Sequence, residues 1–168
     1  MVDFDVVDLP EADHVAEGER APEFTRPLVG AEYWTDTALS DLDGPVALVF
    51  FPMDGAFPAT YVWNEIRDRE WGVDEDLTVV GVSISTPYEH KTFVEERGIR
   101  YELFSDPSAE IGDRYGAVQD LDGMTGVREH RPAVFLLDED RTVEYAWVAD
   151  QWPDFPDYDE VEAHIDNL

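Results

Sequence analysis

Apolar positions along the chain fall into short runs that alternate with segments of helical periodicity. The clearest run, residues 46–51, is continuously apolar and ends at Pro52. An unbroken apolar strand is typical of a parallel sheet that is covered on both faces, so we predict that this run is a central strand. Residues 60–70 then place apolar side chains at helical spacing, with Thr60 available as the N-cap, and predict a helix.

The alternation of strands and helices continues along the rest of the chain. The β-branched residues 77–84 predict a second strand, and residues 88–97, which Gly98 terminates, predict the helix that follows. Strand and helix units of this kind, ending in a hairpin and a helix, describe an α/β fold with helices on both faces of a mixed sheet. The later elements are a strand at 101–104, a helix at 109–115, a hairpin of 133–137 with 142–147, and a helix at 158–167.

Length and composition indicate a single domain. A chain of 168 residues, 43% of them hydrophobic, can bury one full core. Residues 1–20 are acidic and without periodicity, so we expect them to form an N-terminal lead-in that is mobile or packed at an edge. The domain itself is expected to comprise residues 21–168.

The acidic composition changes the expected surroundings of the protein. Asp and Glu number 40 against 11 Lys and Arg, and the formal net charge is -29. In molar salt the Debye length falls to about 3 Å and screens this repulsion, so the composition favours a halophilic protein. The alternative is an acidic surface that docks a basic partner or mimics nucleic acid, although the acids are spread along the whole chain. Nucleic-acid binding is not expected, because phosphate contacts need clustered Lys and Arg.

The sequence carries no signal for a membrane or for export. It has no stretch of about 18 apolar residues, and its N-terminus is acidic where a signal peptide would be basic. We therefore expect a cytoplasmic protein that does not associate with a membrane.

The chain contains no cysteine, which excludes a disulfide, a thiolate nucleophile and a cysteine-ligated metal. Its four histidines are far apart and lack the spacing of metal-binding motifs. We therefore expect no metal and no other cofactor, and we expect most of the histidines at the surface. They are His14, His90, His130 and His164.

Residues that punctuate the predicted elements fall in a characteristic order. Residues 18–24 read Gly-Glu-Arg-Ala-Pro-Glu-Phe, and the central strand ends in Phe50-Phe51-Pro52. Together with later matches, this order resembles the alkyl hydroperoxide reductase and thiol-specific antioxidant family, the peroxiredoxins, especially the one-cysteine and bacterioferritin-comigratory types. The resemblance implies a thioredoxin-like fold with a central mixed β-sheet flanked by helices. The later matches are Val80-Gly81-Val82-Ser83, Ser105-Asp106-Pro107, Tyr115-Gly116 and Phe135-Leu136-Leu137-Asp138.

The resemblance also implies the position of a catalytic loop. In the family, a Pro-x-x-x-Thr-x-x-Cys loop places the peroxidatic thiolate in the first turn of the next helix. Here the loop begins at Pro52, but Ala56 stands at the threonine position and Ala59 at the cysteine position. Asn64 occupies the position of the resolving cysteine of the bacterioferritin-comigratory type. Because peroxide reduction needs a reactive sulfur, Ala59 predicts that this activity is lost.

The family also carries an arginine that stabilises the thiolate. The family spacing points to Pro132, and Arg131 lies one residue earlier. If Arg131 reaches the pocket, its guanidinium and the free N–H groups near Thr60 form a ligand site for a small anion or a hydroperoxide. If it does not, Arg131 is an ordinary surface cation. Both interpretations stay open at this point.

Two functional hypotheses follow from these residues. The first is a peroxiredoxin-family protein without thiol peroxidase activity that has a binding or interaction role on the retained scaffold. The second is an antioxidant oxidoreductase with a non-cysteine or partner-supplied centre, or an engineered Cys-to-Ala form of an active enzyme. Ala56 favours natural loss, because an engineered trap would change only the cysteine. The aromatic residues Trp63 and Trp71 suggest a homodimer face, although side chains of this kind more often belong to the core.

Overall fold

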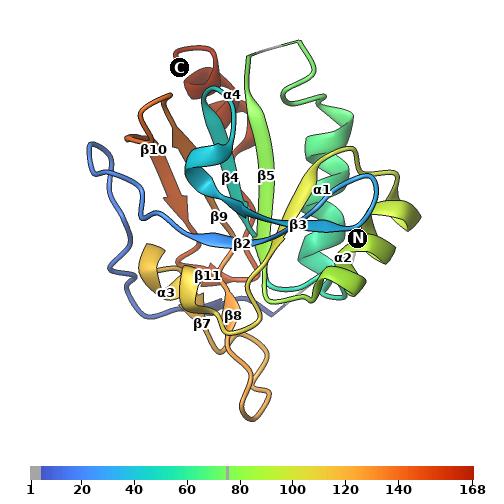
Figure 1. Ribbon diagram of the computed structural model, residues 1–168. Coiled ribbons are helices and arrows are strands. Elements are labelled where there is room, and N and C mark those ends of the chain that lie inside the picture. Colours follow the sequence, from blue (N-terminus) through green and yellow to red (C-terminus); the bar gives the residue numbers. More distant parts are fainter. Residues whose placement is uncertain (1–4, 75) are drawn as a thin grey trace.

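A seven-stranded mixed sheet organises the computed structural model, which describes residues 5–74 and 76–168 (Figure 1). The strand order is β10-β9-β4-β5-β6-β2-β3. Two small two-stranded sheets, β1-β11 and β7-β8, lie outside it. The strands are β1 (Val7–Asp8), β2 (Thr25–Val29), β3 (Trp34–Ala38), β4 (Val46–Phe50), β5 (Thr78–Ser83), β6 (Glu102–Ser105), β7 (Val118–Gln119), β8 (Glu129–His130), β9 (Ala133–Leu137), β10 (Val143–Val148) and β11 (Gln151–Trp152). The helices are η1 (Leu39–Asp41), α1 (Phe57–Asp68), α2 (Pro87–Arg97), α3 (Glu110–Tyr115) and α4 (Tyr158–Ile165).

Strand β4 lies in the centre of the sheet, as its apolar run predicts. All five of its residues are buried, and it pairs in parallel with β5 and antiparallel with β9. Val49 is opposite Gly81 on one side and Val134 on the other. The prediction of a central mixed β-sheet flanked by helices is therefore confirmed.

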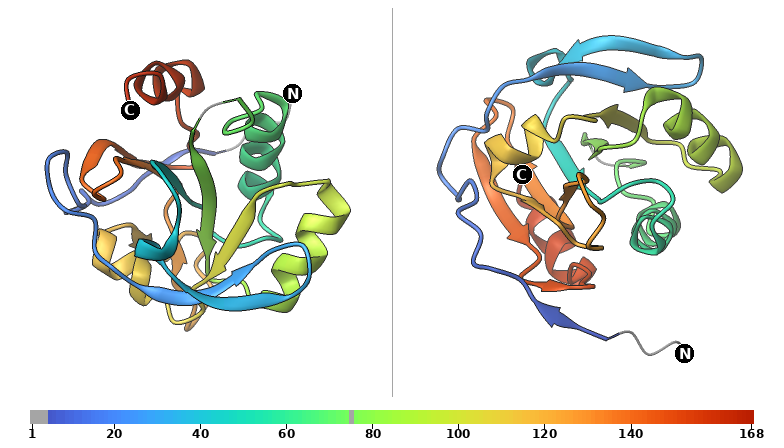
Figure 2. Two further views of the ribbon diagram at one scale, coloured as in Figure 1. Left: turned by 45° about the horizontal axis from the view of Figure 1, so that its top comes forward. Right: turned by 90° about the horizontal axis from the view of Figure 1, so that it is seen from below.

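Different helices and loops pack on the two faces of the sheet. Alternate side chains of the central strand, such as Val49 and Phe51, belong to the core that contains residues of α1, α2 and α4. Leu48 and Phe50 belong to the opposite core, with residues of α3, of η1 and of the chain before β2. Figure 2 shows α1 and α2 side by side along the sheet. This alternation is the period-2 geometry of a strand.

Helix α1 begins earlier than its sequence suggests. Its first residue is Phe57 and its N-cap is Ala56, which makes no side-chain capping bond, so the prediction of Thr60 as N-cap was wrong. Pro58 lies in the first turn, where its fixed φ and missing N–H are tolerated. Helix α2 ends as predicted, with Gly98 in the left-handed region at φ 61°.

Several paired segments have no counterpart in the predicted elements. The β2-β3 hairpin carries Pro27 and an exposed outer strand, and neither feature is typical of a strand pattern. Within the lead-in, Val7 pairs with Trp152, and Arg20 forms an isolated bridge with Thr142. The boundary between lead-in and domain stays a prediction.

Candidate functional site

The loop of residues 52–56 joins β4 to α1, and the residues at its end face the protein interior. Pro52 is buried and Ala56 is half-buried. Ala59 has none of its surface exposed and belongs to the core on the α1 face of the sheet. The side chain at position 59 is therefore a methyl group packed among apolar neighbours.

The start of α1 has few N–H groups to offer a ligand. Pro58 has no N–H, and the N–H of Ala59 already donates to the Ala56 carbonyl at 3.1 Å. Thr60 is half-buried and lies within the helix. A small anion or hydroperoxide bound near Thr60 stays a prediction.

Arg131 is buried, with 3% of its surface exposed, and is not the ordinary surface cation of the second interpretation. Its guanidinium donates to the carbonyls of Pro10 at 2.7 Å and Ala149 at 3.2 Å, and to the Gln119 side chain at 3.1 Å. Burial lowers the pKa of Arg131. These partners belong to the lead-in, β7 and the turn before β11, so a role for Arg131 in a pocket at Ala59 stays a prediction.

The loop contributes Asp54 to a buried Asp–His pair with His90 of α2, and sequence reasoning missed this pair. The two carboxylate oxygens of Asp54 lie 2.9 and 2.8 Å from Nδ1 of His90, and Nε2 of His90 lies 2.9 Å from the Phe104 carbonyl oxygen. His90 has no exposed surface and Asp54 has 8%. The loop is tied further by the Asp54 N–H, which donates to Oγ of Ser85 at 2.9 Å.

The hydrogen-bond partners of His90 determine which of its two ring nitrogens carries a proton. A carbonyl oxygen only accepts, so Nε2 of His90 carries a proton and donates to Phe104. Between Nδ1 and the Asp54 carboxylate there is then one more proton, held by the ring or by the acid. Burial raises the pKa of Asp54, while the hydrogen bond and the charge of His90 partly offset this effect.

A second Asp–His pair lies on the other face of the sheet. Nε2 of His130 is 2.8 Å from Oδ2 of Asp106, and Nδ1 is 3.2 Å from the Val82 carbonyl oxygen. The same Oδ2 accepts the N–H groups of Ile111 at 2.9 Å and Gly112 at 3.2 Å. Both Asp106 and His130 have no exposed surface. The pair therefore joins β6, α3 and β8 without contact with solvent.

Comparison with known proteins decides the family. The sequence profile described as AhpC/TSA family matches residues 18–146. The chain belongs to the AhpC/TSA family.

Relatives and solved structures agree with this assignment. A protein of Mycobacterium tuberculosis named as a peroxiredoxin is 28% identical over 136 residues, which is 79% of this chain and 84% of the relative. The thiol peroxidase of Oceanobacillus iheyensis is 27% identical over 156 residues, covering 88% of this chain and 87% of its own length. Peroxidoxin BcpB from Mycobacterium tuberculosis has a TM-score of 0.72 at 25% identity, with 92% of this chain and 94% of that one covered. The reduced 2-Cys peroxiredoxin of Plasmodium vivax has a TM-score of 0.76 at 20% identity, with 90% and 94% covered.

This AhpC/TSA family member has the thioredoxin-like fold without the peroxidatic cysteine. None of its 168 residues is a cysteine, so no other position supplies the missing thiol. Within residues 5–74 and 76–168, no three potential ligands among His, Asp and Glu are placed to hold a metal ion. In that part of the chain, no helix is long and apolar enough to cross a membrane.

Two expectations about aromatic and histidine side chains need correction. The histidines are not at the surface: His90 and His130 are fully buried, and His14 and His164 are half-buried. Trp63 and Trp71 lie in the core with at most 1% of their surface exposed, so they cannot form a homodimer face. Trp63 is buried because α1 turns this side toward the sheet, and Trp71, which follows the helix, packs into the same core and donates Nε1 to Glu162 at 2.9 Å.

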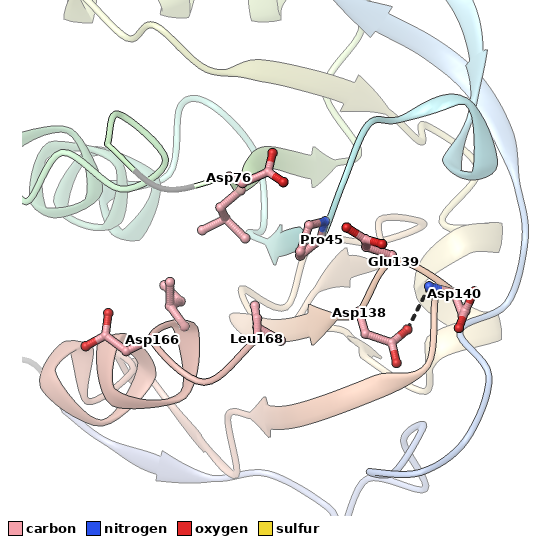
Figure 3. Close-up of a pocket in the computed structure, with 9 residues that line it drawn as sticks. Pro45, Asp76, Asp138, Glu139, Asp140, Asp166 and Leu168 are labelled. Carbon is pink, nitrogen blue, oxygen red and sulfur yellow. Dashed lines mark hydrogen bonds between the residues drawn. The ribbon is translucent and has the colours of Figure 1, made fainter.

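A separate pocket of about 570 Å³ lies at the other end of the sheet, beside the start of β4 (Figure 3). Its apolar floor is formed by Pro45, Leu77, Ile165 and Leu168. Carboxylates surround this floor and no Lys or Arg lines it, so the pocket offers negative charge without a nucleophile or a preformed metal site. The acids are Asp76, Asp138, Glu139, Asp140 and Asp166.

Proposed function

We propose that this chain is a peroxiredoxin-family protein that does not reduce peroxides through a thiol and instead has a binding or interaction role on the retained scaffold. The observation that carries the proposal is Ala59, a fully buried methyl group in the first turn of α1 at the position of the peroxidatic cysteine. A methyl group can neither attack a peroxide oxygen nor form a sulfenic acid.

The state of the neighbouring residues supports the proposal. Ala56 has no hydroxyl to place beside a substrate, and the two terminal nitrogens of Arg131 donate to Pro10, Gln119 and Ala149. Two parts of a thiol peroxidase site, the thiol and the threonine hydroxyl, are thus absent together, and the terminal nitrogens of Arg131 are directed to other groups.

Retention of the loop itself supports a role other than peroxide reduction. The Asp54 N–H bond to Ser85 and the Asp54 contact with His90 hold the loop in one conformation without help from a cysteine. These anchors keep the loop and the pocket that Asp54 and Gly55 line in place, although the cysteine position carries a methyl group.

A peroxide consumption assay tests the proposal. The natural chain, Ala56→Thr, the double variant Ala56→Thr/Ala59→Cys and the triple variant that adds Pro132→Arg are compared in molar salt with a dithiol donor. We expect no turnover by the natural chain or by Ala56→Thr, which controls for the loop without adding sulfur. Metal-free catalytic turnover by the natural chain would overturn the proposal. Turnover only in the two variants that carry Ala59→Cys would support the proposal. The triple variant should be faster, because Pro132 occupies the position of the family arginine.

A further inference from the structure

An acidic and aromatic surface extends from the loop at Asp54 across α2 to the β2-β3 turn. A pocket of about 440 Å³ between the loop and α2 is lined on one side by Tyr88. A second pocket of about 380 Å³ at the β2-β3 turn is lined by Trp34. The rings of Tyr88 and Trp34 are 5.1 Å apart and nearly perpendicular, so one aromatic wall joins the two pockets.

The aromatic wall is unusually exposed for residues of this size. Tyr88 is 67% exposed, Trp34 is 37% exposed, and Tyr33, which contacts Trp34 at 5.9 Å, is 66% exposed. Exposed clusters of large aromatic side chains are typical of binding surfaces, since burying them there contributes much of the association free energy.

Both pockets are negatively charged. Asp54, Glu89 and Glu96 line the first pocket and leave it net negative against its one cation, Arg97. The second pocket is lined by Glu32 and Glu102, and the one cation at its edge is Lys91, whose ammonium donates to the carbonyls of Gly30 and Ala31.

The ammonium of Lys91 already binds to this surface within the molecule. The Nζ atom of Lys91, the only lysine in the chain, lies 5.9 Å from the centroid of the Tyr33 ring. The same ammonium donates to the Ala31 carbonyl at 2.5 Å. The combination of aromatic faces, carbonyls and carboxylates is therefore suited to a cation.

We propose that this surface docks an extended, basic segment of a partner protein, with a Lys or Arg side chain in the pocket beside Asp54 and a second one in the pocket beside Glu102. This inference rests on the proposed binding role and specifies its partner chemistry. Charge complementarity selects a basic partner, because the surface presents five carboxylates against two cations, Arg97 and Lys91.

The shape of the surface selects a polypeptide over a small amine. Two pockets joined by a wall of exposed aromatic rings offer separate sites for successive side chains of one extended chain. A small amine would fill one pocket and leave the aromatic wall uncovered.

Asp54 is the most buried acidic side chain of this surface. Both of its oxygens share the single Nδ1 of His90, so the carboxylate keeps acceptor capacity toward the pocket that it lines. A cationic side chain that reaches it would be shielded from solvent, where a charge-assisted hydrogen bond is stronger than at the surface.

Binding is tested by fluorescence anisotropy with a fluorescein-labelled octapeptide of alternating lysine and alanine. An alternating glutamate–alanine octapeptide and free cadaverine are the comparison ligands, and the salt is about 0.15 M and about 1 M KCl, where the Debye length falls from about 8 to about 3 Å. We expect the basic peptide to bind at both salt concentrations, and we expect the acidic peptide not to bind. Cadaverine that competed as tightly as the peptide would overturn the choice of a polypeptide.

Matched charge variants separate this surface from the general charge of the molecule. Glu89→Gln/Glu96→Gln should weaken peptide binding about tenfold in 1 M KCl, and Tyr88→Ala about fivefold. Glu139→Gln/Asp140→Asn removes the same charge at the acidic pocket of Figure 3 and should change affinity less than about twofold. Equal losses in the two double variants would overturn the proposal, because attraction would then come from net charge alone.

The outcomes also distinguish this inference from the proposed function. Absence of peptide binding would overturn the docking surface but would leave the loss of peroxide reduction untouched. Peroxide turnover by the natural chain would overturn the proposed function, whatever the peptide does.

Discussion

Two buried Asp–His pairs occupy equivalent places on opposite faces of the sheet. His130 binds the carbonyl of Val82 in β5, and His90 binds the carbonyl of Phe104 in β6. Val82 and Phe104 are register partners, so the two rings flank the same step of the β5-β6 ladder. Each ring is then held by an aspartate that follows a strand.

The pairs differ in what surrounds the aspartate. Asp106 is fully buried, and its Oδ2 accepts two N–H groups at the start of α3 as well as the His130 ring. Asp54 lines a pocket, and the only ring donor of its two oxygens is His90. We infer that the Asp106 pair mainly stabilises the fold and that the Asp54 pair can respond to a bound group.

The largest expected effect comes from removing the charge of each aspartate. Asp106→Asn should lower the free energy of unfolding by about 4 kcal/mol, because the neutral amide loses the ion pair with Arg26 and is a weaker acceptor for the His130 ring and the two helix N–H groups. Asp54→Asn should cost about 1 kcal/mol, because its single ring contact can be replaced by an amide. Urea unfolding of both variants in molar salt measures the difference. Equal losses would contradict the proposed distinction between the pairs.

A glycine beside each pair gives a second test. A Cβ on Gly112 would lie 2.6 Å from the His130 ring and 2.2 Å from Val118, so Gly112→Ala should destabilise by about 3 kcal/mol. Gly55, next to Asp54, has nothing within 4 Å of such a Cβ, and Gly55→Ala should change stability by less than about 0.5 kcal/mol. Thermal unfolding of the two variants checks this contrast. A large loss of stability in Gly55→Ala would show that the loop is packed as tightly as the surroundings of the Asp106–His130 pair.

Glu129 is the neighbour of His130 on β8. It should dominate the pH dependence of stability on the face of the sheet that carries the Asp106–His130 pair. Burial, reinforced by the carboxylate of Asp122, raises the pKa of Glu129 from 4.5 to about 8. The folded chain therefore keeps a proton that the unfolded chain releases, and the stability this proton contributes is complete below pH 4.5 and is lost as the pH rises through 8.

Replacing the Glu129 carboxyl should remove this contribution to the pH dependence of stability. Glu129→Gln should be more stable than the natural chain by on the order of 2 kcal/mol at alkaline pH and similar to it in mild acid. Urea midpoints at about pH 4.5 and about pH 9 measure this. An unchanged slope in Glu129→Gln would show that Glu129 does not carry the pH dependence.

The smallest expected effect is a gain at the loop. Ala56 is the N-cap of α1 with φ -77° and ψ 141°, an extended conformation that suits a capping side chain, yet it makes no capping bond. Ala56→Thr should raise the free energy of unfolding by at most about 0.5 kcal/mol, because Pro58 has no N–H and the hydroxyl can only share the Ala59 N–H, which already donates to the Ala56 carbonyl. Chemical unfolding checks the gain. A loss would mean that the space beside Ala56 is filled.

Much of the fold and part of the site could be predicted from local pattern. The apolar run at 46–51 indicated the central strand, and the family's loop spacing located Pro52 after this strand and Ala56 and Ala59 at the start of α1. The start of α1 itself was placed too late, because Thr60 has a capping side chain whereas Ala56 does not. The β2-β3 hairpin was missed because its strands are held by pairing with β6 and with each other rather than by an apolar pattern.

The amino-acid order alone determined that this chain has a peroxiredoxin-type core and no sulfur for thiol chemistry, since periodicity and residue identity are local properties. Only the tertiary structure decided the partners of the buried polar groups. His90 and Asp54 are 36 residues apart, and Arg131 and Pro10 are 121 apart. A buried donor or acceptor must be satisfied by whichever group the packed elements bring to it, and that depends on how distant segments are arranged in space.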